Sequence, residues 1–190
     1  MVIHLSKGGN ISLSKEAPGL QEVLVGLGWD VRETEGTMFD LDASAFLVDA
    51  SGKSRSADDF IFYNNKSNAN GSVVYGGDNR TGQGEGDDET IKIDVTKIPA
   101  GTVRIVIVVT IDEAESRKQN FGQIRNAYIR VVDNKLNKEI ARFDLGEDAS
   151  LETGIIFGEI YMHNGEWKFK AVGQGVKGGL EAFLVMFGLK

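Results

Sequence analysis

Short apolar runs recur along the chain and are separated by turn-forming residues. The run at 103–111 (VRIVIVVTI) is almost continuous in β-branched apolar residues, which is typical of a central strand covered on both faces. The run at 166–172 alternates instead, with Trp167, Phe169 and Ala171 on one face. Further strands are predicted at 2–6, 22–29, 41–49, 60–63, 73–75, 90–95, 127–132, 138–145 and 155–162. This spacing predicts a mainly β protein, a sandwich or a barrel, rather than alternating βαβ units.

Turn and helix signals refine this picture near the C-terminus. Asn164-Gly165 supplies the two positive φ angles of a type I′ turn, so residues 155–172 are predicted to form a hairpin with His163 as a surface residue beside the turn. Leu180, Phe183, Leu184 and Phe187 fall on one helical stripe, which predicts a helix docked on the sheets. Brief helices are also expected at 113–121 and 147–152. No repeat or domain boundary is evident, so residues 1–190 are expected to form a single domain.

Composition agrees with a globular β protein. The chain contains only two prolines but 24 glycines, a mixture that suits strands joined by tight turns. Its 41% hydrophobic and 26% charged residues are ordinary for a globular protein. No segment approaches the ~20 apolar residues of a membrane-spanning helix, and the N-terminus has no signal-peptide pattern. We therefore expect a cytoplasmic protein.

The absence of cysteine excludes disulfides, thiolate metal sites and thiol nucleophiles. Only His4 and His163 offer imidazole ligands, so a histidine-rich zinc site is not expected. Oxygen donors are plentiful, and oxygen favours calcium, magnesium or manganese. The net charge of −7 argues against unaided binding to nucleic acid or to an anionic membrane.

Residues 76–89 (GGDNRTGQGEGDDE) form the most informative stretch of the sequence. They place the five carboxylates of Asp78, Glu85, Asp87, Asp88 and Glu89 in mid-chain between two predicted strands. Crowded carboxylates repel one another, and a hard divalent cation resolves that conflict. Calcium takes about six to eight oxygen ligands, and glycines let the backbone offer carbonyls beside the carboxylates. The stretch predicts a calcium site; the alternative is a solvated acidic loop.

The acidic stretch is not an EF-hand. Residues 78–89 have the right length, but Arg80, Gly82 and Gln83 stand where that motif needs two oxygen ligands and a glycine. A sandwich whose loops gather acidic residues is the better analogy. If the strands simply alternate in direction, one group of acids lies at the same end as the stretch and another at the opposite end. The first group is Asp49, Asp58, Asp59, Asp112 and Glu113; the second is Asp30, Asp40 and Asp42. Either group can complete the coordination, because one long crossover would exchange them.

Two other types of site are not supported by their sequence context. Residues 173–178 (GQGVKG) match G-x-G-x-x-G, but only twelve residues follow, too few for the remaining strand of a dinucleotide-binding unit. These glycines are expected to make a turn that lets the last helix pack closely. There is no G-x-S-x-G elbow, Walker loop or H-E-x-x-H motif, and the protein is expected not to be an enzyme.

Several stretches resemble the tellurite-resistance TerD family of stress-response proteins. They are 26–30 (GLGWD), 40–49 (DLDASAFLVD), 58–65 (DDFIFYNN), 77–89 (GDNRTGQGEGDDE), 117–122 (RKQNFG) and 157–175 (FGEIYMHNGEWKFKAVGQG), so the resemblance spans nearly the whole chain. The usual acidic motif carries an aspartate or a short acid-Gly-Asp run where this chain has 83–87 (QGEGD), which leaves the ligand-bearing ends unchanged.

The resemblance implies a β-sandwich of two mostly antiparallel sheets with a few short helices, which binds calcium, with two ions expected. It implies calcium ligands at Asp78, Asn79, Asp87, Asp88 and Glu89, with Asp30, Asp42 and Asp59 as second-tier candidates. The implied partners are other proteins of the tellurite-resistance system or a membrane; nucleic acid is not expected. Without cysteine, support for tellurite resistance must be indirect.

Three functional classes are therefore compared. The leading hypothesis is a non-enzymatic, calcium-dependent interaction module of a stress-response system. The second is a calcium-dependent phospholipid binder that acts like a C2 domain. The third is a metal-dependent hydrolase.

Overall fold

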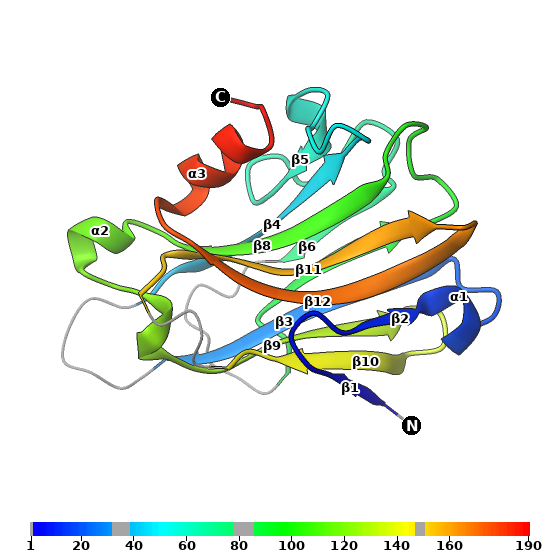
Figure 1. Ribbon diagram of the computed structural model, residues 1–190, viewed down its shortest axis with the longest axis horizontal. Coiled ribbons are helices and arrows are strands. Elements are labelled where there is room, and N and C mark those ends of the chain that lie inside the picture. Colours follow the sequence, from blue (N-terminus) through cyan, green and yellow to red (C-terminus); the bar gives the residue numbers. More distant parts are fainter. Residues whose placement is uncertain (1, 32–38, 78–85, 147–150) are drawn as a thin grey trace.

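The computed structural model describes residues 2–31, 39–77, 86–146 and 151–190. Within these ranges, twelve strands form two six-stranded sheets that stack face to face, which confirms the expected sandwich (Figure 1). Sheet A has the order β1 (Ile3–Leu5), β10 (Lys138–Asp144), β9 (Ile124–Asp133), β3 (Glu22–Val31), β7 (Glu89–Asp94) and β6 (Val73–Gly77). Sheet B has the order β2 (Asn10–Ser12), β12 (Glu166–Val176), β11 (Gly154–His163), β8 (Arg104–Ile111), β4 (Leu41–Val48) and β5 (Phe60–Ile61).

All strand pairs are antiparallel in the described part of the chain except β1 with β10, which is parallel. The helices there are short: α1 (Leu13–Glu16), α2 (Ala114–Arg117), α3 (Gly179–Met186) and the 3-10 turns η1 (Ala57–Asp59) and η2 (Phe121–Gln123). The predicted helix at 147–152 falls largely outside the described residues. None of the described helices is long and apolar enough to span a membrane.

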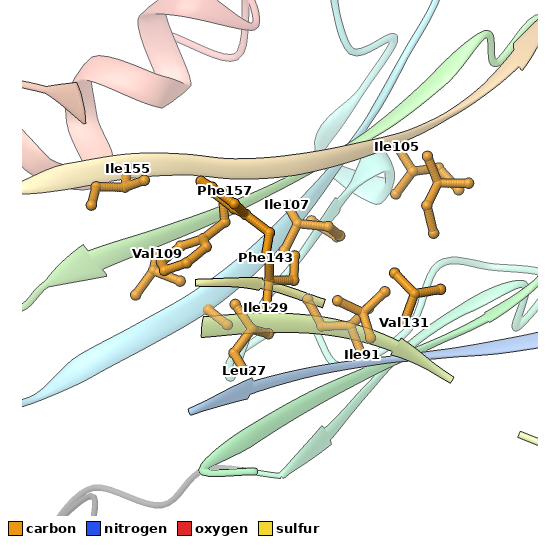
Figure 2. Close-up of a cluster of buried hydrophobic side chains, with 14 of the residues drawn as sticks. Leu27, Ile91, Ile105, Ile107, Val109, Ile129, Val131, Phe143, Ile155 and Phe157 are labelled. Carbon is orange, nitrogen blue, oxygen red and sulfur yellow. The ribbon is translucent and has the colours of Figure 1, made fainter. Parts of the chain in front are cut away.

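The main core lies between the two sheets (Figure 2). Side chains from β3, β7, β9 and β10 of sheet A meet side chains from β8 and β11 of sheet B, including Leu27, Ile91, Ile129, Phe143, Ile107 and Phe157. The continuous apolar run of β8 is buried on both faces, as predicted, and its inward residues Ile105, Ile107 and Val109 belong to the main core. Its outward residues Val106 and Val108 enter a second apolar cluster.

Helix α3 closes that second cluster on the outer face of sheet B. Phe183 is fully buried, and the ring of Phe187 lies 4.5 Å from that of Phe46. The predicted docking of the C-terminal helix is therefore confirmed. The predicted hairpin is confirmed as well, with φ values of 51° at Asn164 and 75° at Gly165 between β11 and β12.

The expectation for the glycines at 173–178 is wrong in part. Gly173 and Gly175 continue β12 as a strand rather than forming a turn. The register with β11 shifts at this point, and Gly173 has a φ of 63°, so it occupies a β-bulge that favours glycine. Only Gly178 and Gly179, with φ values of 97° and 57°, make the turn into α3.

Candidate functional site at the acidic end of the sandwich

Most of the candidate acids lie at one end of the sandwich. Strands β3 and β8 end there and strands β4 and β7 begin there, because Leu27 pairs with Glu89 and Leu41 pairs with Ile111. We call this region the acidic end. Its acids on or beside the described strands are Asp30, Asp40, Asp42, Asp87, Asp88, Glu89, Asp112 and Glu113.

The expectation from simple strand alternation is wrong for two groups of acids. Asp30, Asp40 and Asp42 lie with the acidic stretch rather than opposite to it, whereas Asp49, Asp58 and Asp59 lie at the other end. The cause is the connection after β5. Strands β5 and β6 run in the same direction, because residues 62–72 pass from sheet B back to sheet A between them. Alternation fails at that single step, so the acids that precede it exchange ends, whereas Asp112 and Glu113 lie beside the acidic stretch as expected.

Asp59 is therefore separated from the other candidate ligands. Its carboxylate accepts hydrogen bonds from Nε and Nη2 of Arg55, both at 2.8 Å, and a third from the backbone N–H of Arg55 at 3.0 Å. Asp58 accepts from the backbone of Ala69, and Asp49 accepts from Ser51. These acids fix turns at their own end. The candidate ligands Asp78 and Asn79 lie outside the described residues.

Asp87 is bound by cationic and phenolic side chains from β9. Arg130 donates from Nε to Oδ1 at 2.7 Å and from Nη2 to Oδ2 at 2.9 Å. The hydroxyl of Tyr128 lies 3.0 Å from Oδ1 and 2.9 Å from the carbonyl oxygen of Gly86. The side chain of Asp87 is only 6% exposed. Hydrogen bonding to Asp87 raises the pKa of Arg130, and burial, followed by the charge of Asp87, raises the pKa of Tyr128.

Two glycines of β3 make room for this arrangement on the outer face of sheet A. A Cβ atom at Gly26 would lie 2.0 Å from Oδ2 of Asp87, and one at Gly28 would lie 2.4 Å from the ring of Tyr128. The guanidinium of Arg142 covers the same tyrosine ring at 3.8 Å from its centroid. Because Gly26 and Gly28 have no side chains, the carboxylate of Asp87 and the ring of Tyr128 can pack directly on the backbone of β3.

Asp88 and Glu89 attach the same segment to both sheets. Asp88 donates its backbone N–H to the carbonyl oxygen of Leu27 at 2.7 Å, and its Oδ2 accepts from the backbone N–H of Trp29 at 2.8 Å. Glu89 is 1% exposed, and its Oε1 accepts from the hydroxyl of Tyr75 at 2.9 Å. Its Oε2 accepts from the backbone N–H of Ala43 on β4 at 2.5 Å, which is a link between the sheets.

The second-tier acids at this end have different surroundings. Asp30 is exposed on β3, and its Oδ2 accepts from Nδ2 of Asn126 at 2.6 Å. Asp42 is half-buried on β4, directly before the Ala43 that binds Glu89. Asp112 donates its backbone N–H to the carbonyl oxygen of Asp40 at 2.8 Å. Asp40, Asp42, Glu89 and Asp112 are therefore held together by the meeting of β4, β7 and β8.

A groove of about 710 Å³ opens beside Asp42. It lies between the end of β8, helix α2 and the start of α3. Figure 1 shows α2 and the start of α3 at the same end of the molecule. Its lining includes Asp42, Asp112, Glu115, Leu180 and Glu181. Arg117 offsets part of this charge, because it pairs with Glu113 at 2.8 Å and Asp112 at 3.5 Å. The groove thus combines carboxylates with an apolar portion of α3.

The donor set of the acidic end matches a hard cation in chemistry. Its side chains offer carboxylate oxygens and neither thiolate nor imidazole, which suits calcium or magnesium rather than zinc. Among residues 2–31, 39–77, 86–146 and 151–190, no three acidic or histidine side chains converge closely enough to hold a metal ion. Asp88 and Glu89 end the acidic stretch, and the bond from Ala43 to Glu89 brings the neighbouring Asp42 of β4 beside them.

Sequence reasoning missed the residues that hold Asp87. Arg130 and Tyr128 lie on β9, more than forty positions away, and nothing in their local sequence marks them. A signal was present in 26–30 (GLGWD), where two glycines at alternating positions of a strand mark one face that something approaches closely.

Comparisons with known proteins agree with this fold. A model of the TerD domain matches residues 1–187. Tellurium resistance protein TerD of Serratia marcescens is 56% identical over 189 residues, covering 100% of this chain and 98% of that protein. General stress protein 16U of Bacillus subtilis (strain 168) is 53% identical over 191 residues, covering 100% of this chain and 99% of that protein.

A solved structure has the same fold at much lower identity. The crystal structure of a homologue of telluride resistance protein (TerD) from Streptomyces coelicolor A3(2) matches with a TM-score of 0.70 at 21% identity, over 87% of this chain and 95% of that chain. The sandwich is thus shared where most residues differ. The family model over residues 1–187 and the full-length matches place the chain in the TerD family of tellurium-resistance and stress-response proteins.

Proposed function

We propose that this protein is a calcium-binding, non-enzymatic interaction module of a tellurium-resistance or stress-response system. The observation that carries the proposal is the link from Glu89 to the backbone of Ala43. Through it, the exit of the acidic stretch on sheet A is fixed beside Asp42 on sheet B. Carboxylates from separate segments thereby lie at one end, which is how a sandwich assembles an oxygen-rich site from several loops.

The proposed ions, two in number, bind at the acidic end. Asp42, Asp88 and Glu89 are the proposed ligands among the described residues, Asp30 lies nearby on β3, and Asp78 and Asn79 remain predicted ligands from the sequence. Calcium would neutralise the mutual repulsion of these carboxylates. Asp59 is not included, because it is bound by Arg55 at the other end.

The proposed role is to present a binding surface for another protein. The groove beside Asp42 supports this part of the proposal, because an acidic candidate ligand lines it directly. Calcium bound to Asp42 would make the net charge of the groove less negative and would thereby change which partners it can bind. The names of the relatives, tellurium resistance protein and general stress protein, support a role in such a system. Direct thiol reduction of tellurite is excluded, since the chain contains no cysteine.

Calorimetric titration with calcium, in the presence of magnesium as competitor, tests the proposal. We expect calcium to bind and to raise the melting temperature, because a ligand at about 100 times its Kd stabilises the folded state by roughly 2.7 kcal/mol. Asp88→Asn should weaken binding. An absence of both heat and thermal shift would overturn the proposal and leave a solvated acidic end.

The type of partner requires a second experiment. Capture of partners from an extract of the source cells, with calcium or with chelator, should give different protein profiles. Sedimentation with anionic liposomes under the same two conditions separates this outcome from a phospholipid binder. Identical protein profiles together with calcium-dependent sedimentation would support the phospholipid alternative instead.

A further inference from the structure

We propose that Asp87 is an anchor of the calcium site rather than a calcium ligand, and that Arg130 is the residue that positions it. This inference rests on the proposed calcium function. It assigns different roles to neighbouring carboxylates that look equivalent in the sequence. It also gives a role to an arginine that lies on another strand.

The anchoring role follows from the cation that already binds Asp87. Glu89 also accepts on both oxygens, but those donors, the hydroxyl of Tyr75 and the backbone N–H of Ala43, are neutral. Both oxygens of Asp87 accept from the guanidinium fork of Arg130, and Oδ1 also lies within hydrogen-bonding distance of Tyr128. A bidentate arginine–carboxylate pair is among the strongest and most directional contacts of side chains. The carboxylate is 6% exposed and lies directly over Gly26, so it faces the sheet. A cation that approached these oxygens would meet the positive charge of Arg130 at the same atoms.

Arg130 is itself held in place from its other side. Its Nη1 donates to Oε2 of Glu139 on β10 at 3.0 Å. The arginine therefore connects β9, β10 and the chain at Asp87 across the outer face of sheet A. All five N–H groups of a guanidinium lie in one plane. The bond to Glu139 on one side therefore orients the fork that binds Asp87 on the other side.

The anchor acts on the proposed ligands through one short piece of chain. Asp87 immediately precedes Asp88 and Glu89, and the backbone N–H of Asp88 is bound to Leu27. Release of Asp87 would free the chain on the loop side of Asp88. The proposed ligand Asp88 would keep its bonds to Leu27 and Trp29 on β3 but would lose the restraint on its loop side. Residues that orient metal ligands without touching the metal typically contribute about 10- to 100-fold to metal affinity.

The chain offers a closely matched control pair at the opposite end. Arg55 binds Asp59 through the same Nε and Nη2 fork, with both distances at 2.8 Å and side-chain exposures of 36% and 5%. The corresponding exposures are 30% for Arg130 and 6% for Asp87. The two pairs are therefore alike in geometry and burial, but only one adjoins the proposed site.

The test uses the full chain with Arg130→Met, Asp87→Asn, the double variant and the control Arg55→Met. Calcium affinity is measured by calorimetry, and the melting temperature is measured in chelator. We expect Arg130→Met and Asp87→Asn each to weaken calcium binding about tenfold or more with no change in the number of ions, and the double variant to be no weaker than either. Arg55→Met should lower the melting temperature similarly but leave the affinity within about twofold, because its site is distant.

The contrary outcomes are distinct. If Asp87→Asn abolishes one ion while Arg130→Met leaves the affinity unchanged or increases it, Asp87 is a ligand and the inference is wrong. If Arg55→Met weakens binding as much as Arg130→Met, the effect is general destabilisation and the inference is also wrong. Arg130→Lys, which keeps the charge but not the fork, should bind with intermediate affinity and serves if Arg130→Met does not fold. Absence of calcium binding by the unmodified chain would instead overturn the proposed function itself.

Discussion

Glu89 on β7 accepts a hydrogen bond from the backbone N–H of Ala43 on β4, across the gap between the two sheets, at 2.5 Å. Its other oxygen accepts from Tyr75, and the residue is 1% exposed. A buried carboxylate needs donors of this kind, because burying a charge without hydrogen bonds is costly. Glu89 is therefore a structural link between the sheets as well as a proposed calcium ligand.

Glu89→Ala should destabilise the calcium-free protein. The substitution leaves the N–H of Ala43 and the hydroxyl of Tyr75 without this acceptor, which costs about 2–4 kcal/mol. Denaturant unfolding in chelator measures the change. Tyr75→Phe is the control and should cost less, because Glu89 keeps its bond to Ala43. A loss below about 0.5 kcal/mol for Glu89→Ala would contradict the assignment.

Gly26→Ala should displace Asp87 and destabilise the fold. The new Cβ would lie 2.0 Å from Oδ2, and overpacking of this kind costs about 1–3 kcal/mol. Thermal unfolding of the variant measures the effect. Gly146→Ala is the control, since a Cβ there meets no atom within 4 Å. Equal melting temperatures for the two variants would show that Asp87 moves aside without cost.

Asp42→Asn and Asp59→Asn should differ in their effect on calcium. Asp42 lies at the acidic end, so its loss should weaken calcium binding about tenfold, in line with the dependence of affinity on ligand charge. Asp59 lies at the opposite end, so its loss should reduce stability through Arg55 and leave calcium affinity unchanged. Calorimetry of both variants decides this. Weaker binding in Asp59→Asn alone would mean that the ions bind at the other end.

Asp94 provides a pH-dependent contribution to stability that is distant from the acidic end. Hydrogen bonds from Lys97 and then Thr96 lower the pKa of its carboxyl below the usual 3.8. Because the folded-state pKa is the lower one, the contribution is complete above about pH 4 and is lost as the pH falls through the folded-state value. Asp94→Asn should therefore be less stable than the parent protein by about 1 kcal/mol at neutral pH. The gap in unfolding free energy should narrow below about pH 4; a constant gap would contradict the linkage.

Phe183→Ala should uncover the outer face of sheet B. Phe183 is fully buried against Gly154 and the second apolar cluster, and loss of a buried phenylalanine costs about 3–5 kcal/mol. Val185→Ala on the same helix is the control, because Val185 is 54% exposed and should change stability by less than about 0.5 kcal/mol. Similar unfolding free energies for the two variants would mean that the packing of α3 on sheet B does not stabilise the native state.

Most of the fold was predictable because its signals are local. The β-branched run of β8, the Asn164-Gly165 turn and the apolar stripe of α3 each specify their own element. Strand β2 was not predicted, because its three residues form a strand only through pairing with β12. The glycines at 173 and 175 were misinterpreted, because a bulged strand and a turn both favour glycine.

The composition of the candidate site was less predictable than the fold. The acidic stretch was evident, but which other acids lie beside it depends on the path of residues 62–72. That segment has no periodic pattern from which the direction of the next strand could be predicted. The partners of Asp87 were not predictable either, since an arginine that will bind a carboxylate looks like any surface arginine on a strand. Side-chain pairing across strands is decided by register, which the whole fold sets.

The links at the acidic end join residues that are far apart in the chain. Glu89 and Ala43 are separated by 46 positions, Trp29 and Asp88 by 59, and Arg130 and Asp87 by 43. Closing such long loops is slow. The bond from Ala43 to Glu89 forms only once the two sheets have docked, and the other two form only once β3 has paired with β7 and β9 in sheet A. A ligand that binds at this end therefore meets no site on a partly folded chain. We expect it to leave the folding rate unchanged and to lengthen the lifetime of the native state by slowing unfolding.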